Sequence, residues 1–394
     1  MGLLGRERRR QQAAAALAVT ACMACSGCAL LDLFRPGNGG GATLWHIEGA
    51  AAPGQPAFDG ATVFFQTRDH GVLALDGTTG NERWRATTDS SRDQSYPSGG
   101  CVISGENVAC GDHDIVAFRR SDGAPAWRYH PTVGYSPGAY EFVAHDGTIF
   151  TGSPSGTMYA IDGATGAQRW VVSTLASASY LVSITYLAVD SDIVVGAYRK
   201  YLNPLRGGVI AVEARTGRVR WNTEFPRPAA DSQTGGEGVA LWKKIVFGSS
   251  TDGRIYALDR ATGVPLWSFR GVGSHVNNQS PWGQDWRALA VAGDRLFAGS
   301  NSGWFVAYDP DAQTELWRVS TGDGSMNSFP MVEDGAAVYA IHANGMLAAF
   351  STRDSDILFH VGNMSGQGLL ATPALGSDKV FAAAVNGFWA FAKH

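Results

Sequence analysis

The sequence predicts an all-β protein, an eight-bladed β-propeller in which each blade is a four-stranded antiparallel sheet. Three observations predict this fold: a motif of eleven residues recurs along the chain, short strand patterns precede each copy, and 50 of the 394 residues are glycine. Glycine at that abundance indicates many tight turns. Successive copies of the motif begin 41 to 51 residues apart, and a period of that size is typical of propellers and solenoids.

The recurring motif can be written AxDxxTGxxxW. Intact copies begin at residues 74, 160 and 257, and the copy at 211 changes only Asp to Glu. Weaker copies begin at 117, 307 and 349, the last with Phe359 in place of Trp. We expect the Asp to accept backbone N–H groups within the turn and the Gly to adopt a positive φ. Each Trp is expected to bury a large face against the neighbouring blade; these blade-docking residues are Trp45, Trp84, Trp127, Trp170, Trp221, Trp267 and Trp317.

A second regular element precedes each copy: a turn, a short apolar strand, a polar turn with Gly and another strand, as in HDGTIFTGSPSGTMYAID at 145–162. Four short strands per period make one blade, so the motif begins on the third strand and ends on the fourth and outermost. The chain ends in NGFWAFAKH, where an eighth motif starts at Ala390 and stops before any Trp. We expect the strand around Trp45 to complete that last blade as its outer strand. This closes a propeller over residues 43–394 and removes an open sheet edge.

The N-terminus has the layout of an export signal. Four arginines from Arg6 to Arg10 precede the apolar run AAAALAVTACMAC, which at about thirteen residues is shorter than the roughly 20 that span a bilayer as a helix. The following CSGC resembles a bacterial lipoprotein box. That resemblance implies a lipoprotein-type signal peptide at 1–27, a lipid on Cys28 and a flexible tether at 28–42. The alternative is that the signal is simply cleaved and the protein is secreted in free form.

The two cysteines of the predicted propeller, Cys101 and Cys110, lie in GGCVISGENVACGD. Gly105-Glu106 can form a two-residue type II′ turn, because Gly takes the positive φ of its first central position. Counting outward from that turn places the cysteines opposite each other as a non-hydrogen-bonded pair, whose side chains approach most closely. That geometry accepts a disulfide, and an exported chain favours one. The alternative is a pair of buried free thiols.

Charge and motif content exclude several function classes. Without residues 1–27 the chain keeps 27 basic against 34 acidic side chains, which gives no electrostatic reason to expect nucleic acid as a partner. The sequence contains no HExxH or P-loop motif, and its nine His are scattered singly. The CxxC spacings in CMACSGC have no partnering His or second Cys cluster at zinc spacing. We therefore predict no catalytic residue, no metal and no cofactor.

The repeated AxDxxTGxxxW is similar to the docking motif of pyrroloquinoline quinone (PQQ) repeat propellers, and the resemblance covers residues 43–394. Two branches share this motif: quinoprotein dehydrogenases, and non-catalytic lipoproteins resembling the B component of the outer-membrane β-barrel assembly machine. The dehydrogenases typically hold the quinone beneath a ring formed by two adjacent bridged cysteines, and this sequence has no Cys-Cys dipeptide. The signal, the lipoprotein box, the length and the blade number resemble the second branch.

That branch implies a membrane-anchored scaffold on the extracytoplasmic side of the cell envelope, which binds other envelope proteins through loops on one face. Because strands alternate in direction, the connections between blades and those between second and third strands share that face. The insertion at 197–208 offers Tyr198, Arg199 and Arg206. The connection at 271–286 offers Trp282 and Trp286. Arg, Tyr and Trp are common in binding hot spots.

Other interpretations stay open at this point. The two loops can be merely longer connections, with both tryptophans packed on a blade edge. The protein can also be an atypical quinone- or metal-dependent oxidoreductase, or a sensor that binds a cell-wall saccharide through Trp282 and Trp286.

Overall fold

The computed structural model describes residues 40–49, 54–88, 100–111, 114–131, 142–173, 181–227, 233–270, 286–300, 303–320, 332–342, 345–361, 372–384 and 387–393. Residues 39–394 form one compact unit. The predicted signal peptide at 1–27 lies outside the described residues, as does the predicted tether at 28–42 except for its last three residues. No helix in the described part of the chain is long and apolar enough to cross a membrane.

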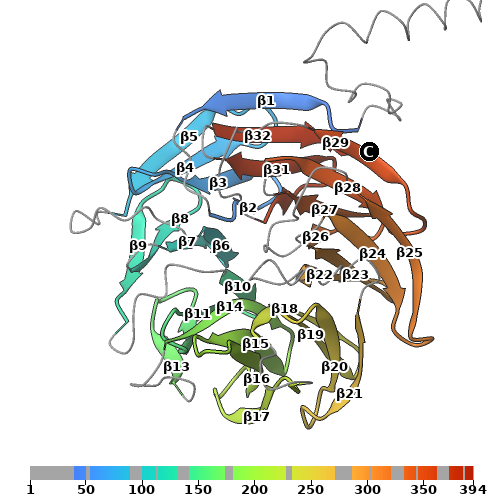
Figure 1. Ribbon diagram of the computed structural model, residues 1–394. Helices are drawn as coiled ribbons and strands as arrows, with labels where there is room; N and C mark the ends of the chain where they lie inside the picture. Colours follow the sequence, from blue (N-terminus) through green and yellow to red (C-terminus); the bar gives the residue numbers. More distant parts are fainter. Residues whose placement is uncertain are drawn as a thin grey trace, which may run out of the picture. The chain divides into compact units, whose positions relative to one another are not determined.

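Eight four-stranded antiparallel sheets make up this unit and confirm the predicted eight-bladed propeller. Figure 1 shows the sheets arranged in a ring, with one edge of each toward the centre and the other at the periphery. We name the strands of a blade A to D from the centre outward. Blades 1 to 4 comprise β2 (Ala57–Phe58), β3 (Thr62–Gln66), β4 (Gly71–Asp76) and β5 (Glu82–Thr87); β6 (Cys101–Ser104), β7 (Asn107–Gly111), β8 (Ile115–Arg119) and β9 (Pro125–Tyr129); β10 (Phe142–His145), β11 (Thr148–Gly152), β12 (Met158–Asp162) and β13 (Gln168–Val172); and β14 (Val182–Val189), β15 (Ile193–Lys200), β16 (Arg206–Glu213) and β17 (Val219–Glu224).

The second half of the ring continues the same order. Blades 5 to 8 comprise β18 (Gly236–Trp242), β19 (Ile245–Ser250), β20 (Arg254–Asp259) and β21 (Pro265–Arg270); β22 (Trp286–Ala292), β23 (Arg295–Ser300), β24 (Trp304–Asp309) and β25 (Thr314–Ser320); β26 (Val332–Glu333), β27 (Ala337–Ile341), β28 (Leu347–Ser351) and β29 (Ile357–Val361); and β30 (Ala374–Leu375), β31 (Lys379–Ala384), β32 (Gly387–Ala392) and β1 (Thr43–Glu48). The last blade therefore takes its outer strand from the beginning of the chain.

Within each blade the motif forms the hairpin between strands C and D. Its first Ala pairs across the hairpin with its Trp, as Ala160 does with Trp170. The Ala is fully buried, and its small side chain leaves space for the indole on the same face of the sheet. In the turn, Asp162 Oδ1 accepts the N–H groups of Ala164 and Thr165 at 3.1 and 2.9 Å. The carboxylate thus stabilises the turn from within.

The Trp of one blade lies against the Gly of the motif in the next blade. A Cβ added to Gly166 would lie 2.7 Å from the indole of Trp127, and Gly166 has a φ of 74°. The Trp127 indole N–H also donates to the Gly163 carbonyl at 3.0 Å. The same two contacts recur at four further interfaces with donor distances of 2.8 to 3.2 Å; the pairs are Trp45 with Gly80, Trp84 with Gly123, Trp170 with Gly217, and Trp221 with Gly263.

Blades 6 and 7 depart from this arrangement. Gln313 stands where the motif has Gly, yet keeps the positive φ, at 56°. In the described part of the chain, the indole N–H of Trp317 has no hydrogen-bond partner. The equivalent carbonyl in blade 7, that of Thr352, instead accepts a hydrogen bond from Arg295, which also donates to the Arg353 carbonyl at 2.9 Å. An arginine therefore makes the polar contact that an indole makes elsewhere in the ring.

Ring closure uses the same contacts divided between the two ends of the chain. β1 lies along β32 (Figure 1), and Trp45 pairs with Ala390 as each motif Trp pairs with its Ala. Gly41 N–H donates to the Ala392 carbonyl at 2.9 Å, just as Gly80 N–H donates to Asp76 within an unbroken motif. A Cβ on Gly41 would lie 2.8 Å from the ring of Phe359. The eighth motif is thus assembled from both termini.

A disulfide joins Cys101 and Cys110, whose Cα atoms are 4.1 Å apart. The two residues face each other in the β6–β7 hairpin, whose turn places Gly105 at a φ of 58°. Both cysteines are fully buried and pack with Phe64 and Trp84 between blades 1 and 2. The bridge is therefore part of the core.

A substitution pair tests the contact between indole and glycine. Gly217→Ala combines the cost of a positive φ, about 1–2 kcal/mol, with overlap against Trp170, about 1–3 kcal/mol. Gly293→Ala carries the first cost alone, because its φ is 59° and no atom lies within 4 Å of the added Cβ. Urea unfolding followed by tryptophan fluorescence should show the larger loss for Gly217→Ala. Equal losses would remove the docking role of that glycine.

A truncation tests closure. We compare the chain trimmed to residues 49–394 with the chain trimmed to 40–394. The shorter form loses β1 and Trp45 and exposes the edge of β32. Its free energy of unfolding should fall by at least about 3–5 kcal/mol, the usual cost of removing a buried Trp. Calorimetric melting at one scan rate checks this, and coincident melting curves would contradict the closure.

The motif carboxylates predict a loss of stability in acid. The hydrogen bond from Arg169, followed by that from Thr165, lowers the pKa of Asp162 to about 2. Likewise Arg218, followed by Thr216, lowers the pKa of Glu213 to about 2. A lowered pKa contributes stability that is present above the unfolded value, near 4, and is lost as the pH falls through the folded value. The free energy of unfolding should therefore decline between pH 4 and pH 2. Asp162→Asn should flatten that decline in urea titrations, and an unchanged slope would contradict the assignment.

Candidate interaction surface

The two faces of the propeller differ in their connections. The A–B and C–D turns share one face, which we call the turn face. The B–C and D–A connections share the other, the loop face. This follows from the antiparallel order of every blade.

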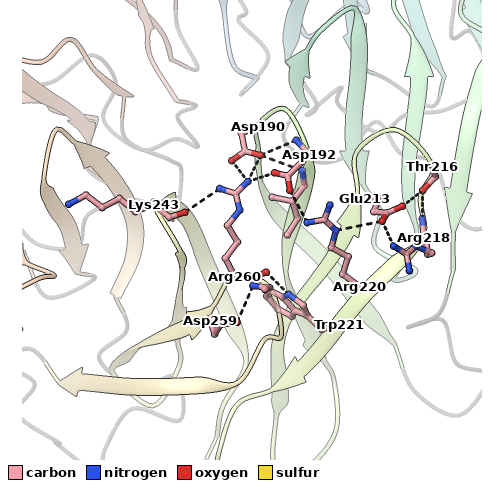
Figure 2. Close-up of polar contacts among 12 residues, drawn as sticks. Asp190, Asp192, Glu213, Thr216, Arg218, Arg220, Trp221, Lys243, Asp259 and Arg260 are labelled. Carbon is pink, nitrogen blue, oxygen red and sulfur yellow. Dashed lines mark hydrogen bonds and ion pairs between the residues drawn. The ribbon is translucent and has the colours of Figure 1, made fainter.

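Ion pairs between neighbouring blades cover part of the turn face. Arg260, in the C–D turn of blade 5, lies between Asp190 and Asp192 in the A–B turn of blade 4 (Figure 2). Its Nη2 is 2.7 Å from Asp190, and Arg220 approaches Asp192 from the other side at 2.8 Å. Although burial opposes ionisation of Asp192, hydrogen bonds from Arg220 and Arg260 lower its pKa. These charged side chains pair with one another, so this part of the turn face stabilises the contact between neighbouring blades.

The same pairing links other blades. Arg120 of blade 2 lies 3.0 Å from Asp59 of blade 1, and Lys393 of blade 8 lies 2.9 Å from Asp334 of blade 7. In each case a cation in a C–D turn meets a carboxylate in the preceding blade's A–B turn. This repetition indicates a structural role for the turn-face charges.

On the loop face, blade 4 has the longest B and C strands. β15 and β16 are each eight residues long and pair as far as Lys200 and Arg206. Most of the insertion predicted as a loop at 197–208 is therefore strand. Tyr198 is fully buried in the core formed by blades 3 and 4, where it packs with residues such as Met158 and Trp170. Its prediction as a partner-binding loop residue was wrong, because position 198 lies in strand B, whose two faces both pack against neighbouring blades.

Arg199 and Arg206 differ in availability. Arg199 forms an ion pair with the buried Glu237 of blade 5, and its Nε donates to the Gly236 carbonyl at 3.1 Å. Burial disfavours its charge, but Glu237 raises the pKa of Arg199 above its usual value. The side chain of Arg206 is 40% exposed, and its Nη1 lies 3.9 Å from Glu224. Arg199 thus joins two blades, whereas Arg206 faces solvent.

Two apolar side chains beside this hairpin are strongly exposed. Leu181 is 69% exposed and Tyr201 is 47% exposed. Tyr201 N–H donates to the Leu181 carbonyl at 2.8 Å, so the two residues are adjacent although they come from different connections. Leu181, Tyr201 and Arg206 form what we call the blade-4 patch. Sequence reasoning missed Leu181, whose only signal is an apolar residue directly before a strand.

The D–A connection at 271–286 contains the two tryptophans that were predicted to bind a partner. Trp282 lies outside the described residues, and Trp286 begins β22 but its side chain lies outside them. Among the described residues, no group of three or more His, Cys, Asp or Glu side chains is placed to hold a metal ion.

The chain matches known proteins over nearly all of the propeller. A family model described as outer membrane protein assembly factor BamB matches residues 36–269 and 251–388. The outer membrane protein assembly factor BamB of Yersinia pestis is 24% identical over 348 residues, which cover 84% of this chain and 82% of that protein. The quinohemoprotein alcohol dehydrogenase ADH-IIG of Pseudomonas putida is 27% identical, over 57% of this chain and 32% of its own length.

A solved structure agrees with the fold. The quinohemoprotein alcohol dehydrogenase of Comamonas testosteroni superposes with a TM-score of 0.65 at 11% identity, over 92% of this chain and 78% of that one. At such low identity the likeness concerns the propeller alone. The family assignment comes from the sequence match, which spans more than half of the chain. On that match, this chain belongs to the family of the outer membrane protein assembly factor BamB.

Proposed function

We propose that this protein is a non-catalytic scaffold of the cell envelope, which docks a protein partner of outer-membrane protein assembly on the blade-4 patch. The observation that carries the proposal is the adjacent exposed pair Leu181 and Tyr201, beside the half-exposed Arg206. A large apolar residue, an aromatic ring and an arginine are typical of protein docking sites. The family to which the chain belongs supports the class of partner.

Membrane anchoring through Cys28 forms part of this proposal. The lipoprotein-type sequence CSGC supports it. A lipid there would hold the propeller at the extracytoplasmic side of a membrane, with residues 28–42 as the tether. Simple cleavage to a free secreted protein stays the alternative. Metabolic labelling with a tagged fatty acid, lost on Cys28→Ser, distinguishes the two.

A PQQ-dependent dehydrogenase is the second candidate, favoured by 27% identity to one such enzyme. The residues do not fit the way that those enzymes hold their quinone. The only disulfide of the described residues spans nine positions of a hairpin and is buried between blades 1 and 2, so it cannot cover a quinone ring. Saturable dye reduction by the purified protein with PQQ, calcium and an alcohol would reject the scaffold proposal.

A saccharide sensor acting through Trp282 and Trp286 stays a further prediction, tested by glycan-array binding of Trp282→Ala.

The docking proposal predicts a specific loss on Leu181→Asp. A photo-reactive residue at position 201 should form an adduct in living cells with a component of outer-membrane protein assembly. Because burying a Leu contributes about 1.5–3 kcal/mol, Leu181→Asp should lower that adduct at least tenfold. The matched control is Leu316→Asp, a leucine 41% exposed on the outer strand of blade 6. Equal adduct yields in both variants, or an adduct only with unrelated proteins, would overturn the proposal.

A further inference from the structure

A shallow groove of about 270 Å³ lies at the outer rim between blades 4 and 5. Pro226 and Arg227, which follow β17, form one side. Arg254 and Tyr256 of β20 and Leu266 and Trp267 of β21 form the other. Arg227 and Arg254 lie toward the loop face, after β17 and at the start of β20, whereas Leu266 lies near the start of β21, toward the turn face. It shares no residue with the blade-4 patch.

The walls of the groove are apolar and firmly held. Tyr256 stacks on Phe225 with ring centroids 4.6 Å apart, and its hydroxyl donates to Asp252 at 2.9 Å. Leu266 is 50% exposed, and its neighbour Val264 is 56% exposed. Rigid aromatic walls beside exposed aliphatic side chains are typical of peptide-binding surfaces.

Position 266 differs in kind from its equivalents in blades 1, 3 and 4. There the residue before the docking Trp is an arginine that pairs with a carboxylate at 2.8 Å, as in Arg83 with Asp76 and Arg169 with Asp162. In blade 5 that position is Leu266, which has no such partner to fold onto and stays in solvent. The propeller architecture therefore does not require an apolar side chain at this rim position.

The charge of the groove is positive. Its described lining contains Arg227 and Arg254 and no carboxylate. Among the described residues, the Nε of Arg227 is buried without a hydrogen-bond partner. Arg254 reaches only Ser268, at 3.3 Å, and the buried Asp252, at 3.8 Å. Arg270, at the end of β21, is exposed and donates to the Asp252 carbonyl. Of these three guanidinium groups, only that of Arg254 lies within 4 Å of the Asp252 carboxylate.

Within the described ranges of the chain, β21 pairs only with β20 and is the last strand of its sheet, so its outer edge is open there. An extended segment can hydrogen-bond to such an edge while its alternate side chains enter the groove. We propose that this groove binds an extended acidic peptide segment of a partner protein, with carboxylates on Arg227 and Arg254 and an apolar side chain against Leu266. Charge complementarity selects the acidic peptide, and the inference is independent of docking at the blade-4 patch.

Selection from a random seven-residue peptide library on the purified protein tests this site. The wild type should enrich sequences in which Asp or Glu alternates with apolar residues. Arg227→Glu with Arg254→Glu should lose that enrichment, and the strongest selected peptide should bind at least tenfold more weakly. The control of equal charge change is Arg85→Glu, on the outer strand of blade 1, with Arg119→Glu, at the end of the third strand of blade 2, which should behave as the wild type.

Leu266→Asp provides a second variant at an exposed position, with circular dichroism and melting to verify its fold; it should also weaken the selected peptide. Leu181→Asp should leave peptide binding intact, which separates this site from the blade-4 patch. The inference is overturned if the selected pools are the same for the wild type and the arginine double variant, or if they are not acidic. Binding of oligogalacturonate in the groove, lost in the double variant while no peptide is enriched, would also overturn it.

Discussion

The contact between an indole and the glycine of the next blade is the constraint on which the ring depends. Gly166 meets two demands at once, because its φ is positive and a Cβ would collide with Trp127. The indole N–H fixes the approach further by donating to the carbonyl of Gly163. Since the Trp belongs to one blade and the Gly to the next, no blade can satisfy this contact alone. The stability of each blade therefore depends on its contacts with the neighbouring blades in the closed ring.

Where the glycine is missing, the structure shows what replaces it. Gln313 keeps the left-handed turn without the flat surface that glycine offers, and its docking partner Trp267 is only partly buried. At the next interface Arg295 takes the carbonyl of Thr352, and in the described part of the chain the Trp317 indole N–H is left unpaired. Blades 5 to 7 thus hold together with a different mixture of contacts. The Trp267 indole itself packs with Phe247, Phe269 and Tyr308.

The fold was predictable because its main constraint is local and repeated. Ala, Asp, Gly and Trp act within eleven residues, and each copy supports the interpretation of the others. Even the split motif was visible, since Ala390 lacks a Trp and Trp45 lacks an Ala. The loop-face residues were harder to predict. Tyr198 was assigned to an inserted loop, whereas it lies in a long strand whose two faces are both covered by neighbouring blades. Arg199 forms an ion pair with Glu237 of another blade, and no local sequence pattern predicts that partner.

The positions free of the docking constraint are those where a binding surface can vary. The architecture requires Trp and Gly in the motif, but it does not constrain the identity of the residue before the Trp. In blades 1, 3 and 4 that residue is an arginine bound to a carboxylate, which keeps the rim polar and internally paired. In blades 5, 6 and 8 it is an exposed leucine, at Leu266, Leu316 and Leu44. Exposed leucines alone make no site, since single apolar side chains are common on protein surfaces. Leu266 differs because the Tyr256 ring and two arginines, Arg227 and Arg254, line the same groove. The repeat constrains the Trp and Gly contacts between blades but not the side chains at the rim. It can therefore acquire a binding groove at one interface without disturbing the others.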